Sequence, residues 1–199
     1  MRGWAAVVST AAVMSAAGTA AASEVWLGAY VHDVEDGLSI GHYEGGAQVA
    51  AGVIGTPLEA LRRVGRPSPY LLAAANTDGG TNYAAAGLSW RLNLRGDGRV
   101  YLRPGLGLAV HDGDTDHPSP YETGITGVEQ MNRFRRGRQE IDLGSRVLFQ
   151  PELALGWRVN ERVAVEASWL HISHGQLFGR QNPGLSDLGI RLVYGFGPS

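Results

Sequence analysis

The sequence predicts an all-β fold, an eight-stranded antiparallel up-and-down transmembrane β-barrel. Three observations carry this prediction. Segments of about ten residues alternate between apolar and polar side chains, which is typical of membrane-spanning strands with two different faces. Several connections between these segments switch between short and long, as they do in bacterial outer-membrane barrels. The chain also begins with a short apolar segment typical of exported proteins.

The clearest alternation covers residues 141–157. Its odd positions are mostly apolar, whereas its even positions include Asp142 and Glu152. Residues 100–111 and 188–196 repeat the pattern. The polar faces combine Gly and Ala with an occasional Arg or Glu, which suits the narrow, packed interior of a small barrel. A secreted β-sandwich would also alternate, but its polar face is usually rich in long solvated side chains.

Eight strands are expected, at residues 25–34, 38–54, 68–76, 83–94, 99–111, 141–157, 162–173 and 187–196. The connections at 93–98 and 159–161 are short enough for tight turns, whereas those at 112–140 and 174–186 are long. An even number of strands with short periplasmic turns and long outer loops is the arrangement of bacterial outer-membrane barrels. The sequence therefore predicts a barrel whose long loops face outward from the cell.

Residues 1–22 have the features of a Sec signal peptide, and residues 23–199 form the predicted barrel domain. Arg2 supplies a positive start, residues 5–17 form an apolar run, and Ala20–Ser23 is a small-residue cleavage site. A membrane anchor would need ~20 strongly apolar residues, and this run is shorter and rich in alanine. We therefore expect export to the bacterial outer membrane.

The composition excludes several classes of function. The 199 residues are 44% hydrophobic, with 29 glycines, no cysteine and a formal net charge of -2. The near-neutral charge gives no reason to expect nucleic acid, and the absence of cysteine excludes disulfides, thiol catalysis and cysteine-ligated zinc. Glycine pairs such as Gly79-Gly80 precede no predicted helix, so a nucleotide site is not expected. No cofactor is predicted.

The segment Trp169–Gly184, WLHISHGQLFGRQNPG, contains the main candidate for chemistry. On a strand over 162–173, His171 and Ser173 lie on the apolar face, which looks at lipid in a barrel. Same-face neighbours are about 6.6–6.8 Å apart at Cα, so the imidazole can reach the hydroxyl and activate it for attack on a carbonyl. By spacing alone, a polar pair at the membrane interface is the simpler interpretation.

The chain resembles the lipid A 3-O-deacylases, also called acyloxyacyl hydrolase-like proteins of the outer membrane. The resemblance rests on blocks in order along most of the mature chain: residues 26–33, 110–113, 142–146, 150–152, 171–173 and 182–184. It implies an eight-stranded barrel with its active site on the outer surface, at the level of the outer leaflet, that cleaves an ester-linked acyl chain from lipid A. It also implies that His171 is the general base and Ser173 the nucleophile.

Two positions depart from that family. The residue after the nucleophile is commonly an asparagine that stabilises the oxyanion, and here it is His174, whose imidazole could donate a hydrogen bond instead. Alignment on residues 182–184 puts Ser186 where the family has a glutamate that orients the histidine. Asp187 is the adjacent carboxylate and our candidate acid, but it faces the lumen unless a β-bulge rotates it outward.

Two further groups are candidates for binding. The stretch His111–His117, HDGDTDH, offers carboxylates to a cation, but its spacing does not match an EF-hand, and a solvated outer loop is the preferred interpretation. Arg135, Arg136 and Arg180 could bind the phosphates of lipid A, although a solvated run of charges balanced by nearby carboxylates is the preferred interpretation of the first two.

The expected partners are lipid A or lipopolysaccharide and outer-membrane lipids, with a possible homodimer. The sequence leaves two other functions open: a non-catalytic barrel that is structural or binds ligands with its loops, and another barrel lipid enzyme such as an acyltransferase or phospholipase.

Overall fold

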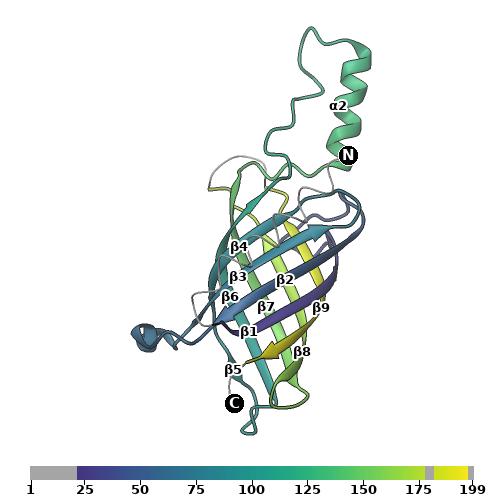
Figure 1. The fold of residues 1–199 in the computed structure, drawn as a ribbon. Coiled ribbons are helices and arrows are strands. Elements are labelled where there is room, and N and C mark those ends of the chain that lie inside the picture. Colours follow the sequence, from purple (N-terminus) through teal and green to yellow (C-terminus); the bar gives the residue numbers. More distant parts are fainter. Residues whose placement is uncertain (1–21, 178–181, 197–199) are drawn as a thin grey trace.

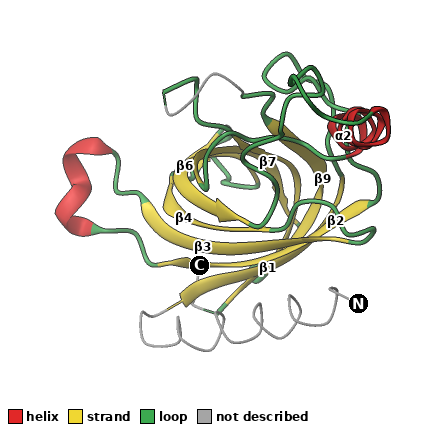
Figure 2. Cartoon of the chain, turned by 90° about the horizontal axis from the view of Figure 1, so that it is seen from above, coloured by secondary structure: helices red, strands yellow, loops and turns green. Residues whose placement is uncertain are grey.

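The computed structural model describes residues 22–177 and 182–196, whose strands close into a barrel (Figure 1, Figure 2). The strands are β1 (Ala22–Val31), β2 (Ala47–Gly55), β3 (Ser68–Asn76), β4 (Tyr83–Ser89), β5 (Leu92–Asn93), β6 (Val100–His111), β7 (Val147–Arg158), β8 (Val163–Ile172) and β9 (Leu185–Gly195). Neighbouring strands pair antiparallel, and β1 pairs with β9, which closes the barrel. The predicted up-and-down architecture is therefore confirmed.

The two short elements β4 and β5 are parts of one wall strand, so the barrel has the predicted eight. Both pair with β6 in the same register. Between them, Trp90 donates its N–H to the carbonyl oxygen of Pro104 at 2.9 Å, but proline has no N–H with which to return the bond. The ladder is therefore interrupted for two residues without any change of direction.

The lumen holds charged side chains that bind one another, among buried aromatic and aliphatic residues. Arg191 donates from Nε to Glu166, and from Nη1 to Glu152 at 3.4 Å. Arg103 donates to Glu166 at 3.0 Å and to Glu24 at 2.6 Å. Large apolar side chains point outward instead, each at least 43% exposed: Leu106, Leu108, Leu153, Leu155, Leu188, Ile190 and Leu192. This arrangement of buried charges and an apolar exterior is the reverse of a soluble protein and suits a wall that faces lipid.

The predicted strand at 38–54 is wrong in its first half, because β2 begins at Ala47. Residues 32–46 form a loop in which several residues, including Asp33 and His42, have positive φ angles of 52° and 66°. Leu38 and Ile40 alternate with Ser39 and Gly41 in sequence, yet they lie on this loop, where both are exposed. Residues 32–46 therefore lie at the end of the barrel, next to the start of β9.

The predicted strand at 141–157 also begins too early, since β7 starts at Val147. Ile141 and Leu143 were expected on the outward face but are 1% and 0% exposed. Gly144 has a φ of 67°, so the chain turns between these residues and the strand. The alternation from Val147 to Trp157 follows the prediction, with exposed or half-buried odd positions and buried even ones.

Two helical elements occur where the sequence pattern predicts only connections. The α-helix α2 (Gly127–Gln139) lies in the long loop between β6 and β7, and the 3-10 helix η1 (Glu59–Val64) joins β2 to β3. Both lie outside the ring of strands, and α2 extends beyond one end of the barrel (Figure 1, Figure 2). Within the part of the chain that the structure describes, no helix is long and apolar enough to cross a membrane. The predicted signal peptide lies outside the described residues except for Ala22.

Candidate active site

The candidate nucleophile and base lie at the end of β8, next to the long loops. His171 is directly opposite Ser186 of β9 in the sheet, so the two side chains share a face. Ser173 follows β8 and exchanges two backbone hydrogen bonds with Phe149 of β7, at 2.7 and 3.0 Å. Nε2 of His171 lies 2.9 Å from Oγ of Ser173. The barrel wall thus fixes both residues of the predicted pair within hydrogen-bonding distance.

The other side of the imidazole contacts a hydroxyl. Nδ1 of His171 lies 2.7 Å from Oγ of Ser186. The indole of Trp169 stacks on the imidazole, with ring centroids 5.5 Å apart and planes 11° from parallel. His171 is 3% exposed, whereas Ser173 is half-buried. The histidine is therefore held on both nitrogens and on one ring face, and the serine keeps access to the surface.

Gly184 packs against this histidine from the loop between β8 and β9. Its φ is 67°, a conformation that L side chains rarely adopt. A Cβ added there would lie 2.8 Å from Cε1 of His171 and 2.6 Å from the carbonyl oxygen of Leu38. Only glycine fits this position without moving the imidazole, which gives the N-P-G motif a structural reason.

Asp187 lies on the opposite face from His171. The register of β8 and β9 is continuous over their whole pairing, so the bulge that would rotate this residue outward does not occur. Asp187 is fully buried, binds Nδ1 of His32 at 2.8 Å and accepts a hydrogen bond from the Tyr83 hydroxyl at 2.9 Å. The geometry therefore places Ser186, and not Asp187, against the histidine.

His32 joins Asp187 to the loop that covers the lumen. Its Nε2 lies 3.0 Å from Oε2 of Glu44, and Glu44 in turn accepts bonds from the backbone and hydroxyl of Thr81. Burial alone would lower the pKa of His32, but its hydrogen bonds to Asp187 and Glu44 outweigh burial and raise it to about 9. This cluster binds the outer loops to the barrel.

His174, the candidate for the oxyanion, is fully buried. Its backbone N–H donates to Oδ1 of Asn182 at 3.0 Å. Asn182 thereby ties the chain just after Ser173 to the start of the N-P-G motif. The described contacts assign the asparagine a role in shaping this loop.

Two of the three arginines proposed for substrate binding lie on α2, beyond the barrel end (Figure 1). Arg136 binds Asp114 at 2.5 Å and Glu140 at 2.8 Å, which agrees with a balanced run of charges. Arg135 is exposed. Arg180 lies outside the described residues. The structure does not bring Arg135 or Arg136 to the His171 side chain.

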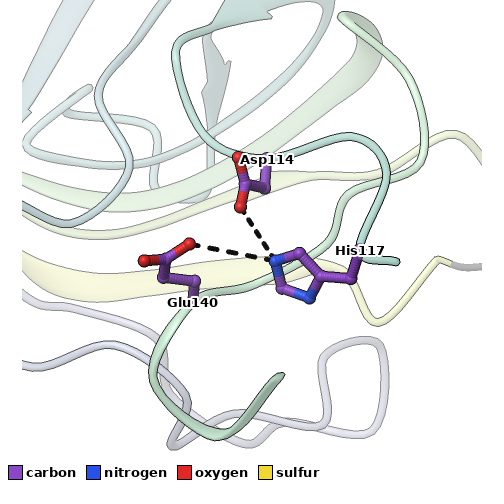
Figure 3. Close-up of side chains that lie close together, drawn as sticks. All are labelled: Asp114, His117 and Glu140. Carbon is purple, nitrogen blue, oxygen red and sulfur yellow. Dashed lines mark hydrogen bonds and ion pairs between the residues drawn. The ribbon is translucent and has the colours of Figure 1, made fainter. Parts of the chain in front are cut away.

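Asp114, His117 and Glu140 form a cluster with donor types that a metal ion could use (Figure 3). Nε2 of His117 is 2.9 Å from Oδ2 of Asp114 and 4.0 Å from Oε2 of Glu140. However, the guanidinium of Arg136 already binds both carboxylates. A cation would have to displace this positive charge. The cluster is therefore better described as a group of ion pairs that joins the loop to α2.

The chain is similar to proteins of one known family. The family model described as lipid A 3-O-deacylase (PagL) matches residues 62–195. The crystal structure of the outer membrane enzyme PagL is 15% identical, with a TM-score of 0.57 over 87% of this chain and 100% of that chain. Two other solved structures match with lower TM-scores.

Neisserial surface protein A is 12% identical, with a TM-score of 0.46 over 87% of this chain and 96% of its own. The Yersinia pestis outer membrane protein Ail is 11% identical, with a TM-score of 0.40 over 86% of this chain and 99% of its own. No curated protein matches the sequence. The match to the family model covers more than half of the chain and the PagL structure has the same barrel. The chain is an outer-membrane β-barrel that belongs to the lipid A 3-O-deacylase (PagL) family.

Proposed function

We propose that this protein is an esterase that hydrolyses the 3-O-linked acyl chain of lipid A, with Ser173 as the nucleophile and His171 as the general base. The observation that carries the proposal is the 2.9 Å separation between Nε2 and Oγ at the outward-facing end of β8. The family match supports the choice of substrate. The barrel fold supports its location, because lipid A forms part of the membrane in which the barrel lies.

The contacts of His171 indicate which ring nitrogen carries the hydrogen of the neutral imidazole. If Nε2 accepts the hydrogen bond of the Ser173 hydroxyl, Nδ1 carries a hydrogen and donates it to Oγ of Ser186. Oγ of Ser173 then attacks the ester carbonyl carbon while Nε2 takes the hydroxyl proton. The imidazolium returns that proton to the sugar oxygen as the carbon–oxygen bond breaks. Water attacks the acyl-enzyme in the same way and releases a free hydroxy fatty acid.

The surface beside this pair suits a lipid substrate. Leu188, opposite Trp169 in the sheet, is 53% exposed on the outward face, and Ile190 is 63% exposed. An acyl chain can lie along these side chains in the bilayer while its ester group reaches Ser173. In this proposal His174 stays the sequence-based candidate for the oxyanion, and Arg135, Arg136 and Arg180 stay candidates for the phosphates. A homodimer is a further possibility that the proposal does not require.

The test is the mass of lipid A from a Gram-negative host that retains its 3-O-acyl chains. Expression of the wild-type protein should remove one hydroxyacyl chain, and Ser173→Ala should abolish that loss. Ser168→Ala is the matched control, because Ser168 lies on the same strand but is buried and bonded to Tyr30. Heat-modifiable migration on gels would establish that each barrel is folded. An unchanged lipid A mass with folded wild-type protein would refute the enzyme and favour a non-catalytic barrel.

A further inference from the structure

The loop of residues 32–46 lies along the start of β9, next to the proposed active site. Val34 donates its N–H to the carbonyl oxygen of Ser186 at 2.8 Å, and Ile40 donates to that of Pro183 at 3.1 Å. The Ser39 hydroxyl donates to the carbonyl oxygen of Gly184 at 3.0 Å. These bonds hold one loop against the segment that packs on His171, although more than a hundred residues separate the two in sequence.

This loop presents the carboxylate of Asp36 to the active site. Oδ2 accepts a hydrogen bond from Nε1 of Trp169 at 2.5 Å, and this is the indole that stacks on His171. Oδ1 accepts the backbone N–H groups of Leu38 and Ser39, at 3.0 and 2.9 Å. Three N–H groups thus bind this carboxylate, and one of them belongs to the indole that stacks on His171.

The Asp36 carboxylate is negatively charged at neutral pH. Its partial burial alone would raise its pKa, but hydrogen bonds from the Ser186 hydroxyl, from two backbone N–H groups and from Trp169 outweigh burial and lower it. The Ser186 hydroxyl is thus one of the groups that lower this pKa, and its Oγ lies 2.7 Å from Nδ1 of His171. A hydroxyl can both accept and donate, which is what a bridge between these groups requires.

The hydrogens along this chain of contacts have one consistent direction. The Ser173 hydroxyl donates to Nε2 of His171, and Nδ1–H donates to Oγ of Ser186. The Ser186 hydroxyl then has its own hydrogen left to donate to Asp36. When Nε2 takes the proton of Ser173, the positive charge on the imidazole is compensated by a carboxylate that lies one hydroxyl away.

We propose that Asp36 is the positioning residue of the active site, and that it orients His171 and compensates its charge through the hydroxyl of Ser186. The proposal rests on the proposed esterase function and deepens it. Asp187 is nearer in sequence, but its carboxylate is on the lumen side and is bound to His32 and Tyr83. A loop carboxylate and a serine would together do the work of a single acid in direct contact with the histidine.

A double-mutant cycle on Asp36 and Ser186 tests this relay in the purified full-length barrel. Asp36→Asn removes the charge and keeps one oxygen for the two backbone N–H groups, whereas its amide nitrogen replaces the oxygen that accepts from Trp169. Ser186→Ala removes the bridge. Each variant should lower kcat on lipid A by about 10- to 100-fold with little change in KM, because ground-state binding does not use the imidazolium. The double variant should be no slower than the slower single variant.

A second readout does not depend on lipid A. A fluorophosphonate probe labels an activated serine when its oxygen attacks phosphorus and displaces fluoride. The rate of labelling at Ser173 should fall in Asp36→Asn and Ser186→Ala by factors similar to those for kcat. Glu35→Gln is the matched control, because Glu35 lies on the same loop but is exposed and is 4.0 Å from the exposed His42. It removes the same charge and should change neither rate.

A rescue variant gives a third, independent measurement. Ser186→Asp would place a carboxylate directly against Nδ1, so adding Asp36→Asn to this variant should cause no further loss. If Ser186→Asp does not fold, the double-mutant cycle on Asp36 and Ser186 still tests the relay.

The outcomes separate the relay from the esterase. Wild-type rates in Asp36→Asn, or losses that multiply in the double variant, would overturn the relay and leave the esterase intact. Labelling of wild-type Ser173 without deacylation would refute the proposed substrate. The labelling rates of Asp36→Asn and Ser186→Ala would still test the relay. A folded wild-type protein that neither labels nor deacylates would overturn both.

Discussion

The inward and outward faces of the β8–β9 pair carry different chemistry on the same two strands. On the inward face, Glu166 is directly opposite Arg191, both are buried, and their charges bind each other. On the outward face, His171 is directly opposite Ser186, and the contact is between an imidazole nitrogen and a hydroxyl. On the inward face, each charged side chain binds a side chain of opposite charge. On the outward face, one imidazole nitrogen of His171 contacts Ser186 and the other contacts Ser173. We therefore expect changes to the inward pairs to affect stability and changes to the outward pairs to affect the proposed reaction.

The largest effect on activity is expected from His171→Gln. Without the imidazole no group accepts the Ser173 proton, so kcat on lipid A should fall about 1,000-fold or more. The side chain makes no ion pair in the described structure, so the urea midpoint of unfolding in detergent should change little. His42→Gln, on an exposed loop position, is the control and should leave both quantities at wild-type values. A His171→Gln variant with substantial activity would contradict the proposed base.

The largest effect on stability is expected from Glu166→Ala on the inward face. This change leaves Arg191 and Arg103 buried beside an empty site, and breaking a buried ion pair in this way costs about 3–5 kcal/mol. The free energy of unfolding in urea should fall by that amount, while kcat per folded molecule stays close to wild type. Glu161→Ala, at the exposed turn before β8, is the matched control. Equal stability of the two variants would show that the lumen network does not hold the barrel.

A smaller effect on activity is expected from Gly184→Ala. The new Cβ would lie 2.6 Å from the carbonyl oxygen of Leu38 and 2.8 Å from Cε1 of His171, so we expect the loop and the imidazole to shift relative to Ser173. Displacement of a catalytic group by a fraction of an ångström to one ångström lowers kcat by about 10- to 100-fold. Gly175→Ala separates this contact from backbone strain, because Gly175 has a φ of 57° but no atom within 4 Å of its added Cβ. Equal losses in the two variants would attribute the effect to strain alone.

The period of the strands made the face of each site residue predictable. Alternation from Val163 onward placed His171 and Ser173 together on the outward side, and the same rule applied from Leu188 placed Ser186 there. These predictions need no knowledge of the rest of the fold, because side chains on a strand alternate wherever the strand lies. The contact between His171 and Ser186 required one more fact, the register of β8 against β9.

The loops were not predictable in the same way. Leu38 and Ile40 alternate with Ser39 and Gly41 as strand residues would, yet this segment is a loop, because positive φ angles and bonds to β9 decide its path. Asp36 consequently carried no signal in the sequence as a neighbour of His171. The helix α2 did carry one, since Thr126 and Glu129 have the spacing of a capping box and the Thr126 side chain accepts the N–H of Glu129.

The smallest expected effect is a pH dependence of stability from His32, on the inward side of the loop cluster. Its pKa is raised from 6.5 to about 9 in the folded protein, because Asp187 and Glu44 outweigh the effect of burial. The protonated histidine therefore contributes stability that is fully present below about pH 6.5 and is lost as the pH rises through about 9. The urea midpoint should decline over this range in the wild type and in His42→Gln, and the decline should be shallower in His32→Gln. Because Asp187 binds His32 and not His171, kcat per folded molecule should be the same in His32→Gln as in the wild type; a large loss of kcat would mean that the inward cluster also serves the outward site.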